Sequence, residues 1–163
     1  MQYEDPILAK LRNLLNEHGP KDLRNKYYLG DPMVVDKSSL PMCFISYERQ
    51  SVIDDASYSI ETHSTVLINV AYDLTRDFNS TAKRSGSHMA LVKMICGRDS
   101  KNKLLPETIL SVLRRFQDEQ SDELIIDLGS QTEIEYVVSE RGGSVFTNEA
   151  LIRFTVRTRD MIG

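Results

Sequence analysis

The sequence is poor in the residues that build metal sites and disulfide frameworks. It contains two cysteines and three histidines among 163 residues. Cys43 and Cys96 do not form a C-x-x-C motif, and His18, His63 and His88 do not share the ligand spacing of a zinc site. We therefore expect free, largely buried thiols, a reducing compartment and no bound metal.

The sequence also lacks long apolar runs and an excess of positive charge. No stretch of about 18 apolar residues occurs, and the first ten residues, MQYEDPILAK, lack a basic region followed by an apolar one. We therefore expect neither a signal peptide nor a membrane-spanning segment. The formal net charge is −4, whereas general nucleic-acid binders are normally basic, which argues against that role.

Catalytic motifs are missing as well. The sequence contains no G-x-G-x-x-G, Walker, H-E-x-x-H or G-x-S-x-G pattern. Gly142-Gly143 is typical of a turn, because no helix is predicted after it. Cys43 lies in a predicted strand and Cys96 on the apolar side of a predicted helix, where buried structural thiols are expected. We therefore expect that the protein is not an enzyme and needs no cofactor.

What is present indicates one ordinary folded domain over residues 1–163. Apolar residues make up 40% of the chain, enough for a core at this length. An amphipathic helix is predicted near the N-terminus, where Asp5 can cap it, Pro6 fits the first helical position and Gly19-Pro20 ends it. Its apolar residues form one stripe: Ile7, Leu8, Leu11, Leu14 and Leu15.

Extended segments follow this helix. Met42–Glu48 is predicted to be a strand, and the polar stretch Gln50–Ser59 an exposed turn or long hairpin tip. Residues 60–74 alternate between apolar even positions and polar odd positions, which is typical of a half-buried strand. Asp77–Ser87 is predicted to be a polar, flexible loop.

Two central helices are predicted next. The first is closed by Gly97, and its apolar positions are Met89, Val92, Ile95 and Cys96. Pro106 is expected to open the second, whose buried stripe comprises Ile109, Val112, Leu113 and Phe116. Asp122–Leu128 indicates a short strand.

The chain closes with a predicted hairpin. Thr132–Glu140 and Asn148–Arg159 alternate as strands do, and they flank the turn Arg141-Gly142-Gly143-Ser144. The order of elements predicts an α+β domain: a mainly antiparallel sheet with the N-terminal helix and the two central helices packed on one side.

Three arginines occupy the polar face of the last strand. Positions 152, 154 and 156 are apolar, whereas Arg153, Arg157 and Arg159 stand at odd positions. If the apolar faces of the two hairpin strands coincide, Glu133 and Glu135 share the outer face with Arg153 and Arg157, and each facing pair of opposite charges contributes about 0.2–1 kcal/mol. Arg159 has no evident partner within the hairpin.

Two segments and the closing hairpin together resemble a known family. The first, KYYLGDPMVVDKSSLPMCFISYE, contains a Tyr-x-Gly-Asp-Pro stretch, a Ser-rich turn and Leu-Pro before a strand, with the matching residues Tyr28, Gly30, Asp31, Pro32, Ser39, Leu40 and Pro41. The second, ICGRDSKNKLLPETILSVLR, places Gly97, Arg98 and Asp99 ahead of the Pro106 helix. In this order, and with a long basic last strand, these features resemble the tail terminator proteins of tailed bacteriophages.

The resemblance implies a structural protein of the virion, assembled in the cytoplasm of the bacterial host. Such a protein forms a ring, expected to be a homohexamer, at the head-proximal end of the tail tube, where it stops tube polymerisation and joins the tail to the neck. Its implied partners are further copies of itself, the tail tube protein, a neck or head-completion protein and, in a contractile tail, the terminal region of the sheath. DNA would pass through the lumen without specific binding, and neither a membrane nor a cofactor is involved.

A closed ring needs head-to-tail contacts between unlike patches, for which charge complementarity is a natural device. The candidate interface residues are Arg153, Arg157, Arg159, Asp54, Asp55, Glu61, Arg98 and Asp99. Two other functions stay open. One is another neck component, such as a head-completion or collar protein, and the other is a small cytoplasmic binding domain whose exposed strand edge recruits a peptide or RNA.

Overall fold

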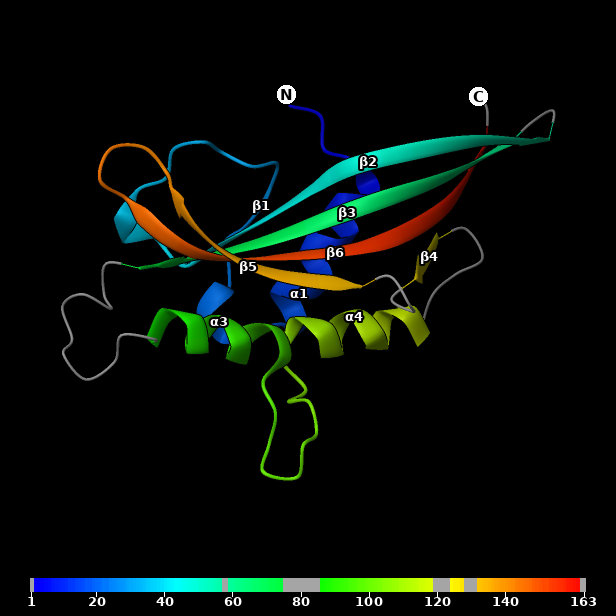
Figure 1. Cartoon of the computed structure of the whole chain (residues 1–163). Coiled ribbons are helices and arrows are strands. Elements are labelled where there is room, and N and C mark those ends of the chain that lie inside the picture. Colours follow the sequence, from blue (N-terminus) through cyan, green and yellow to red (C-terminus); the bar gives the residue numbers. More distant parts are fainter. Residues whose placement is uncertain (1, 57–58, 75–85, 119–123, 128–131, 162–163) are drawn as a thin grey trace.

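Three helices of the described part of the chain cover one side of a six-stranded, mostly antiparallel sheet (Figure 1). The computed structural model describes residues 2–56, 59–74, 86–118, 124–127 and 132–161. In chain order its main elements are α1 (Pro6–His18), β1 (Tyr27–Leu29), β2 (Met42–Ala56), β3 (Ser59–Asp73), α3 (Gly86–Cys96), α4 (Ile109–Asp118), β4 (Leu124–Asp127), β5 (Glu133–Glu140) and β6 (Phe146–Met161). Two short 3₁₀ turns, Lys21–Leu23 and Lys37–Ser39, flank β1. The predicted α+β class is confirmed.

The sheet follows the order β1-β2-β3-β6, and β4 and β5 both pair with the far side of β6. β5 pairs with residues 146–153 and β4 with residues 155–158, so the two lie one after the other along β6. β1 is parallel to β2, and every other described pair is antiparallel. The predicted closing hairpin is confirmed as β5 and β6.

The core lies between the helices and one face of the sheet. On β3 and β6 the even positions form this face, where Val66, Ile68, Ile152 and Phe154 are almost completely buried. α1 begins as predicted, because the Asp5 carboxylate accepts hydrogen bonds from the backbone N–H of residues 7 and 8 at 2.9 and 3.1 Å. The predicted stripe of α4 is also confirmed, since all four of its residues are buried.

Of the two structures predicted for Gln50–Ser59, the long hairpin tip is confirmed: β2 continues to Ala56 and β3 begins at Ser59, and the polar residues are paired in a hairpin that extends beyond the core. Two other local predictions are wrong. α4 begins at Ile109 rather than at Pro106, since the Thr108 hydroxyl accepts a hydrogen bond from the Ser111 backbone N–H and residues before it turn. In α3 the buried stripe runs through Ser87, Leu91, Met94 and Ile95, while Met89 is 54% exposed. The predicted loop Asp77–Ser87 lies mostly outside the described residues.

The second face of the sheet is divided into two ends. At the covered end, the segment of residues 30–41 lies over the sheet, and Val35 and Leu40 pack against Met42, Phe44 and Ala71. The open end comprises the outward-facing residues farther along the strands, namely Arg49, Glu61, His63, Arg153, Arg157 and Arg159. Here the long ends of β2, β3 and β6 extend past the helices (Figure 1).

Candidate interaction surface

Strand pairing arranges the open end as rows of neighbouring side chains. Arg49 of β2 is paired with Thr65 of β3, which is paired with Thr155 of β6. In the following row His63 of β3 faces Arg157 of β6. Three of the predicted interface residues, Glu61, Arg157 and Arg159, are therefore gathered on one surface, with Arg153 beside them.

Arg153 is held by carboxylates of its own chain. Its Nε donates to Glu48 Oε2 at 2.7 Å and its Nη1 to Glu135 Oε2 at 3.0 Å. The predicted shared outer face of Arg153, Glu133 and Glu135 is confirmed, and Glu133 is the residue directly paired with Arg153. The hydrogen bonds to Glu48, and then those to Glu135, raise the pKa of Arg153. These contacts tie β2, β5 and β6 together within one copy.

Arg159 also has an acidic neighbour in its own sheet. It is paired with Glu61 across β3 and β6, a partner that lies outside the hairpin and was not foreseen. Glu61 also lies close to a second basic side chain, since its Oε1 is 3.4 Å from Nε2 of His63. Opposite charges facing each other across strands favour the sheet by about 0.2–1 kcal/mol per pair. Part of the basic face is thus balanced within the fold.

Arg157 differs from its two neighbours on β6. Its Nε is shielded from solvent, yet none of the described residues accepts a hydrogen bond from it. The same is true of Nε2 of His63, the residue paired with Arg157. The open end therefore combines one satisfied arginine with an arginine and a histidine whose shielded nitrogens are not bonded.

The remaining interface candidates are Asp54 and Asp55, near Glu61 in the β2–β3 hairpin, and Arg98 and Asp99, in another part of the fold. The backbone of Asp54 and Asp55 belongs to β2, but their side chains lie outside the described ones. Arg98 and Asp99 lie near the start of the loop between α3 and α4. This loop is on the helical side of the sheet, away from the open end (Figure 1). Asp99 shapes this loop, since its carboxylate accepts from the backbone N–H of Lys101 and Lys103 at 2.8 and 3.0 Å. Arg98 is exposed beside it.

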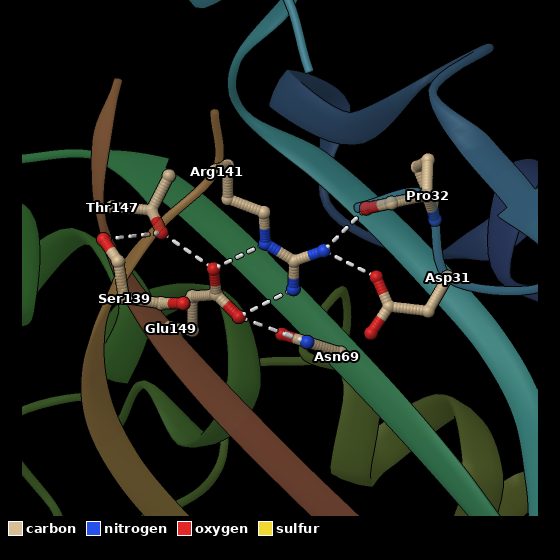
Figure 2. Close-up of polar contacts among 7 residues, drawn as sticks. All are labelled: Asp31, Pro32, Asn69, Ser139, Arg141, Thr147 and Glu149. Carbon is tan, nitrogen blue, oxygen red and sulfur yellow. Dashed lines mark hydrogen bonds and ion pairs between the residues drawn. The ribbon is translucent and has the colours of Figure 1, made fainter. Parts of the chain in front are cut away.

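The most extensive polar network lies at the covered end and was not foreseen from the sequence (Figure 2). Arg141, from the β5–β6 turn, donates from Nε and Nη2 to both carboxylate oxygens of Glu149 at 2.7 Å each. Its Nη1 donates to the Asp31 carboxylate and to the Pro32 carbonyl oxygen. The Asn69 side-chain amide and the Thr147 hydroxyl donate two further hydrogen bonds to the Glu149 carboxylate.

This network fastens the segment of residues 30–41 to the sheet. The side chains of Arg141 and Glu149 are only 8% and 3% exposed, and the Arg141 guanidinium also stacks over the Phe44 ring, 5.1 Å from its centroid. Burial opposes ionisation of Glu149, but hydrogen bonds from Arg141, Thr147 and Asn69 outweigh it and lower the pKa of this carboxyl. Bonds to Glu149 in turn raise the pKa of Arg141. The Gly30-Asp31-Pro32 turn therefore has a structural role, because it provides two of the acceptors for Arg141.

The described residues contain no arrangement typical of an active site. Cys43 is fully buried and its burial raises the pKa of its thiol, which disfavours a nucleophilic thiolate. No group of three His, Cys, Asp or Glu residues that could hold a metal occurs in this part of the chain. Two hollows, of about 860 Å³ beside Tyr3 and Arg12 and of about 710 Å³ beside His18 and Lys93, have no serine, threonine or cysteine among the described residues that line them.

The comparisons with known proteins do not place the chain in a family. No family model matches the sequence, and no curated protein is significantly similar to it. Among the described helices, none has the length and apolar character needed to cross a bilayer.

Proposed function

We propose that this chain is a virion structural protein, a ring-forming tail terminator at the head-proximal end of a phage tail tube. The observation that carries the proposal is a sheet with two edges that have no strand partner among the described strands, in a fold of the predicted α+β class. β1 covers only residues 43–45 of β2, so residues 46–56 have no strand partner on that side among the described strands. At the other side of the sheet, β5 has β6 as its only described strand neighbour.

The directions of these two edges suit a closed ring. β2 is antiparallel to β3, β3 to β6 and β6 to β5, so β2 and β5 run in opposite directions. Rotation about an axis broadly parallel to the strands preserves these directions. It also preserves height along the strands, and by register β4 lies level with residues 49–52 of β2 and runs, like β5, opposite to β2. The β4 edge of one copy would then meet the free β2 edge of the next as an antiparallel pair, a heterologous contact of the kind that closes rings.

The composition of the β2 edge supports its use as a contact. Val52 and Ile53 are 62% and 47% exposed although both are β-branched and apolar. Natural proteins usually protect free edges with charges and bulges. The chain does so only in part, with Glu48 and Arg49 at an irregularity between Tyr47 and Arg49. The net charge of −4 further favours a lumen through which DNA slides without adhering.

Electron microscopy of the purified chain, alone and added to polymerising tail tube protein from the same genome, tests the proposal. We expect rings with a central hole, and tubes that stop growing and carry a ring at one end. Val52→Lys with Ile53→Lys should weaken ring formation, whereas Val34→Lys, at a residue 70% exposed in the segment 30–41, is the matched control. A chain that stays monomeric and leaves tube growth unchanged would contradict a terminator.

The unpaired β2 edge also favours a second candidate, a binding domain that recruits an extended peptide as an additional strand. A monomer that binds a β-forming peptide, and loses that binding in the Val52→Lys and Ile53→Lys double variant, would support this alternative. Tube termination by the wild-type chain would exclude it as the main function.

A further inference from the structure

The loop between α3 and α4 extends away from the sheet on its helical side (Figure 1). Residues 98–104, here called the basic loop, expose three cations, Arg98, Lys101 and Lys103. Among the described residues none of the three forms an ion pair. The carboxylate of Asp99, the acidic residue of this loop, is bonded to backbone N–H groups instead. The basic loop therefore presents positive charge to solvent.

Two arginines of the outer sheet face show the opposite arrangement. Arg153 donates to two carboxylates, and Arg141 donates to the carboxylates of Glu149 and Asp31. The fold pairs these arginines with acidic residues of the same chain. The cations of the basic loop are instead available to a ligand.

The backbone of the basic loop is fixed by its own hydrogen bonds. The Asp99 N–H donates to the Lys103 carbonyl oxygen at 2.9 Å, and the Asn102 N–H donates to the Asp99 carbonyl oxygen at 3.0 Å. Asn102 closes the turn in the left-handed conformation, with a φ of 69°. Because the loop is ordered before any ligand binds, binding costs little conformational entropy of its backbone.

The charge around this loop is opposite to that of the chain as a whole. Residues 98–115 contain five basic and two acidic residues, whereas the rest of the chain contains fifteen basic and twenty-two acidic ones. Arg115 adds to the charge at the base of the loop, since its Nη2 donates to the Pro106 carbonyl oxygen at 3.2 Å. The net charge of −4 is therefore an average over two unlike parts.

The composition of this surface favours a nucleic-acid backbone over a protein surface. Protein interfaces normally have a core of apolar and aromatic side chains. Within residues 98–115, all of which the structure describes, Leu104 is the only large apolar side chain that is exposed. Interfaces with nucleic acids are more polar and much more positively charged.

We propose that the basic loop and Arg115 form a contact site for the phosphate backbone of double-stranded DNA. Neighbouring rows of paired backbone point to opposite sides, so Arg98, bridged to Leu104, and Lys103 flank the loop, and Lys101 stands at its tip. Cations on both sides of a narrow loop match a DNA groove, which has a phosphate backbone along each edge. Such contacts carry no sequence information and let a protein slide along DNA.

Fluorescence anisotropy of a short labelled DNA duplex, titrated with the full chain at several salt concentrations, tests the site. Each neutralised phosphate contributes about −0.9 to the slope of log K against log salt, so four contacts predict a slope of about −3.6. In the double variant Lys101→Gln with Lys103→Gln, binding should weaken for every duplex sequence, and the slope should become shallower by about 2.

Two further variants control for total charge. Lys21→Gln with Lys37→Gln removes the same charge from exposed positions outside the loop, and its slope should stay within about 0.5 of the wild type. Asp99→Asn keeps an acceptor for the backbone N–H groups but removes the negative charge, so it should strengthen binding. Both lysine double variants should keep the wild-type Tm, because the replaced side chains are exposed.

The possible outcomes are distinct. Equal slopes for the loop variant and the Lys21 and Lys37 control would overturn the site. A chain that retains a polyglutamate peptide but not the duplex would make an acidic protein the partner and contradict the proposal. Tighter binding of an RNA duplex of the same sequence would overturn the assignment to DNA. The site requires neither the ring nor the tail, so a failure of either proposal leaves the other standing.

Discussion

The covered and open ends of the outer sheet face lie on the same strands, yet they treat their polar groups differently. At the covered end Arg141 reaches Glu149, Asp31 and the Pro32 carbonyl, and a segment from far earlier in the chain closes over the site. At the open end Arg157 has a shielded Nε without a bond from the described residues. The covered end thus pairs its buried charges within the chain, although Asn69 Oδ1 there is buried without a hydrogen bond, whereas at the open end the unbonded atom belongs to a charged side chain.

The largest expected effect concerns the covered end. Arg141→Met leaves the Glu149 carboxylate buried without its counter-charge, and we expect it to lower the free energy of unfolding by about 3–5 kcal/mol. Urea unfolding measures the difference. The double variant Arg141→Met with Glu149→Leu should recover part of the loss, because it removes the stranded charge. A loss below about 1 kcal/mol in the single variant would show that the network does not hold the covered end.

Acidification should weaken the covered end selectively. The folded pKa of Glu149 is lowered, so its contribution is fully present above the unfolded value of about 4.5 and is lost as the pH falls through the folded pKa. The difference in unfolding free energy between the wild type and Glu149→Gln should therefore be largest above this pH and narrow below it. Urea unfolding from pH 7 to pH 3 checks this. A difference that stays constant with pH would contradict the assigned charge.

The smallest expected effect concerns the boundary of the open end. Arg153 is 25% exposed and its partners Glu48 and Glu135 are 42% and 57% exposed, so water screens both pairs. We expect Arg153→Met to lower the free energy of unfolding of the unassembled chain by about 1 kcal/mol or less. Chemical denaturation at low and high salt measures it, and most of the effect should vanish at high salt. An effect as large as that of Arg141→Met would erase the contrast between the two ends.

Much of the fold could be predicted because its signals are local. The cap at Asp5, the stripe of α4 and the alternation of β3 and β6 depend on residues a few positions apart, and the structure confirms them. The length of β2 could not be predicted in this way. Its polar second half resembles a turn in composition, and only its long hairpin pairing with β3 makes it a strand.

The candidate surface, too, could be predicted only where its signals are local in the sequence. The sequence predicted that Arg153, Arg157 and Arg159 share a face and that glutamates of β5 lie on it, because side chains alternate along a strand. It gave no signal that Arg153 would reach Glu48 or that Arg159 would face Glu61, since β2 and β3 come from distant parts of the chain. Which arginine is left unsatisfied therefore depends on the neighbours that the sheet order brings to each.

By itself, the sequence determined the α+β class, the order of most elements and the basic outer face of the last strand. These features depend on the spacing of apolar and polar residues that are close together in the sequence. Only the tertiary structure decided that Asp31 meets Arg141 across 110 positions and that Arg157 lies beside His63. The physical reason is that hydrogen bonding and burial depend on which strands lie side by side, and this choice is made by packing of the whole core.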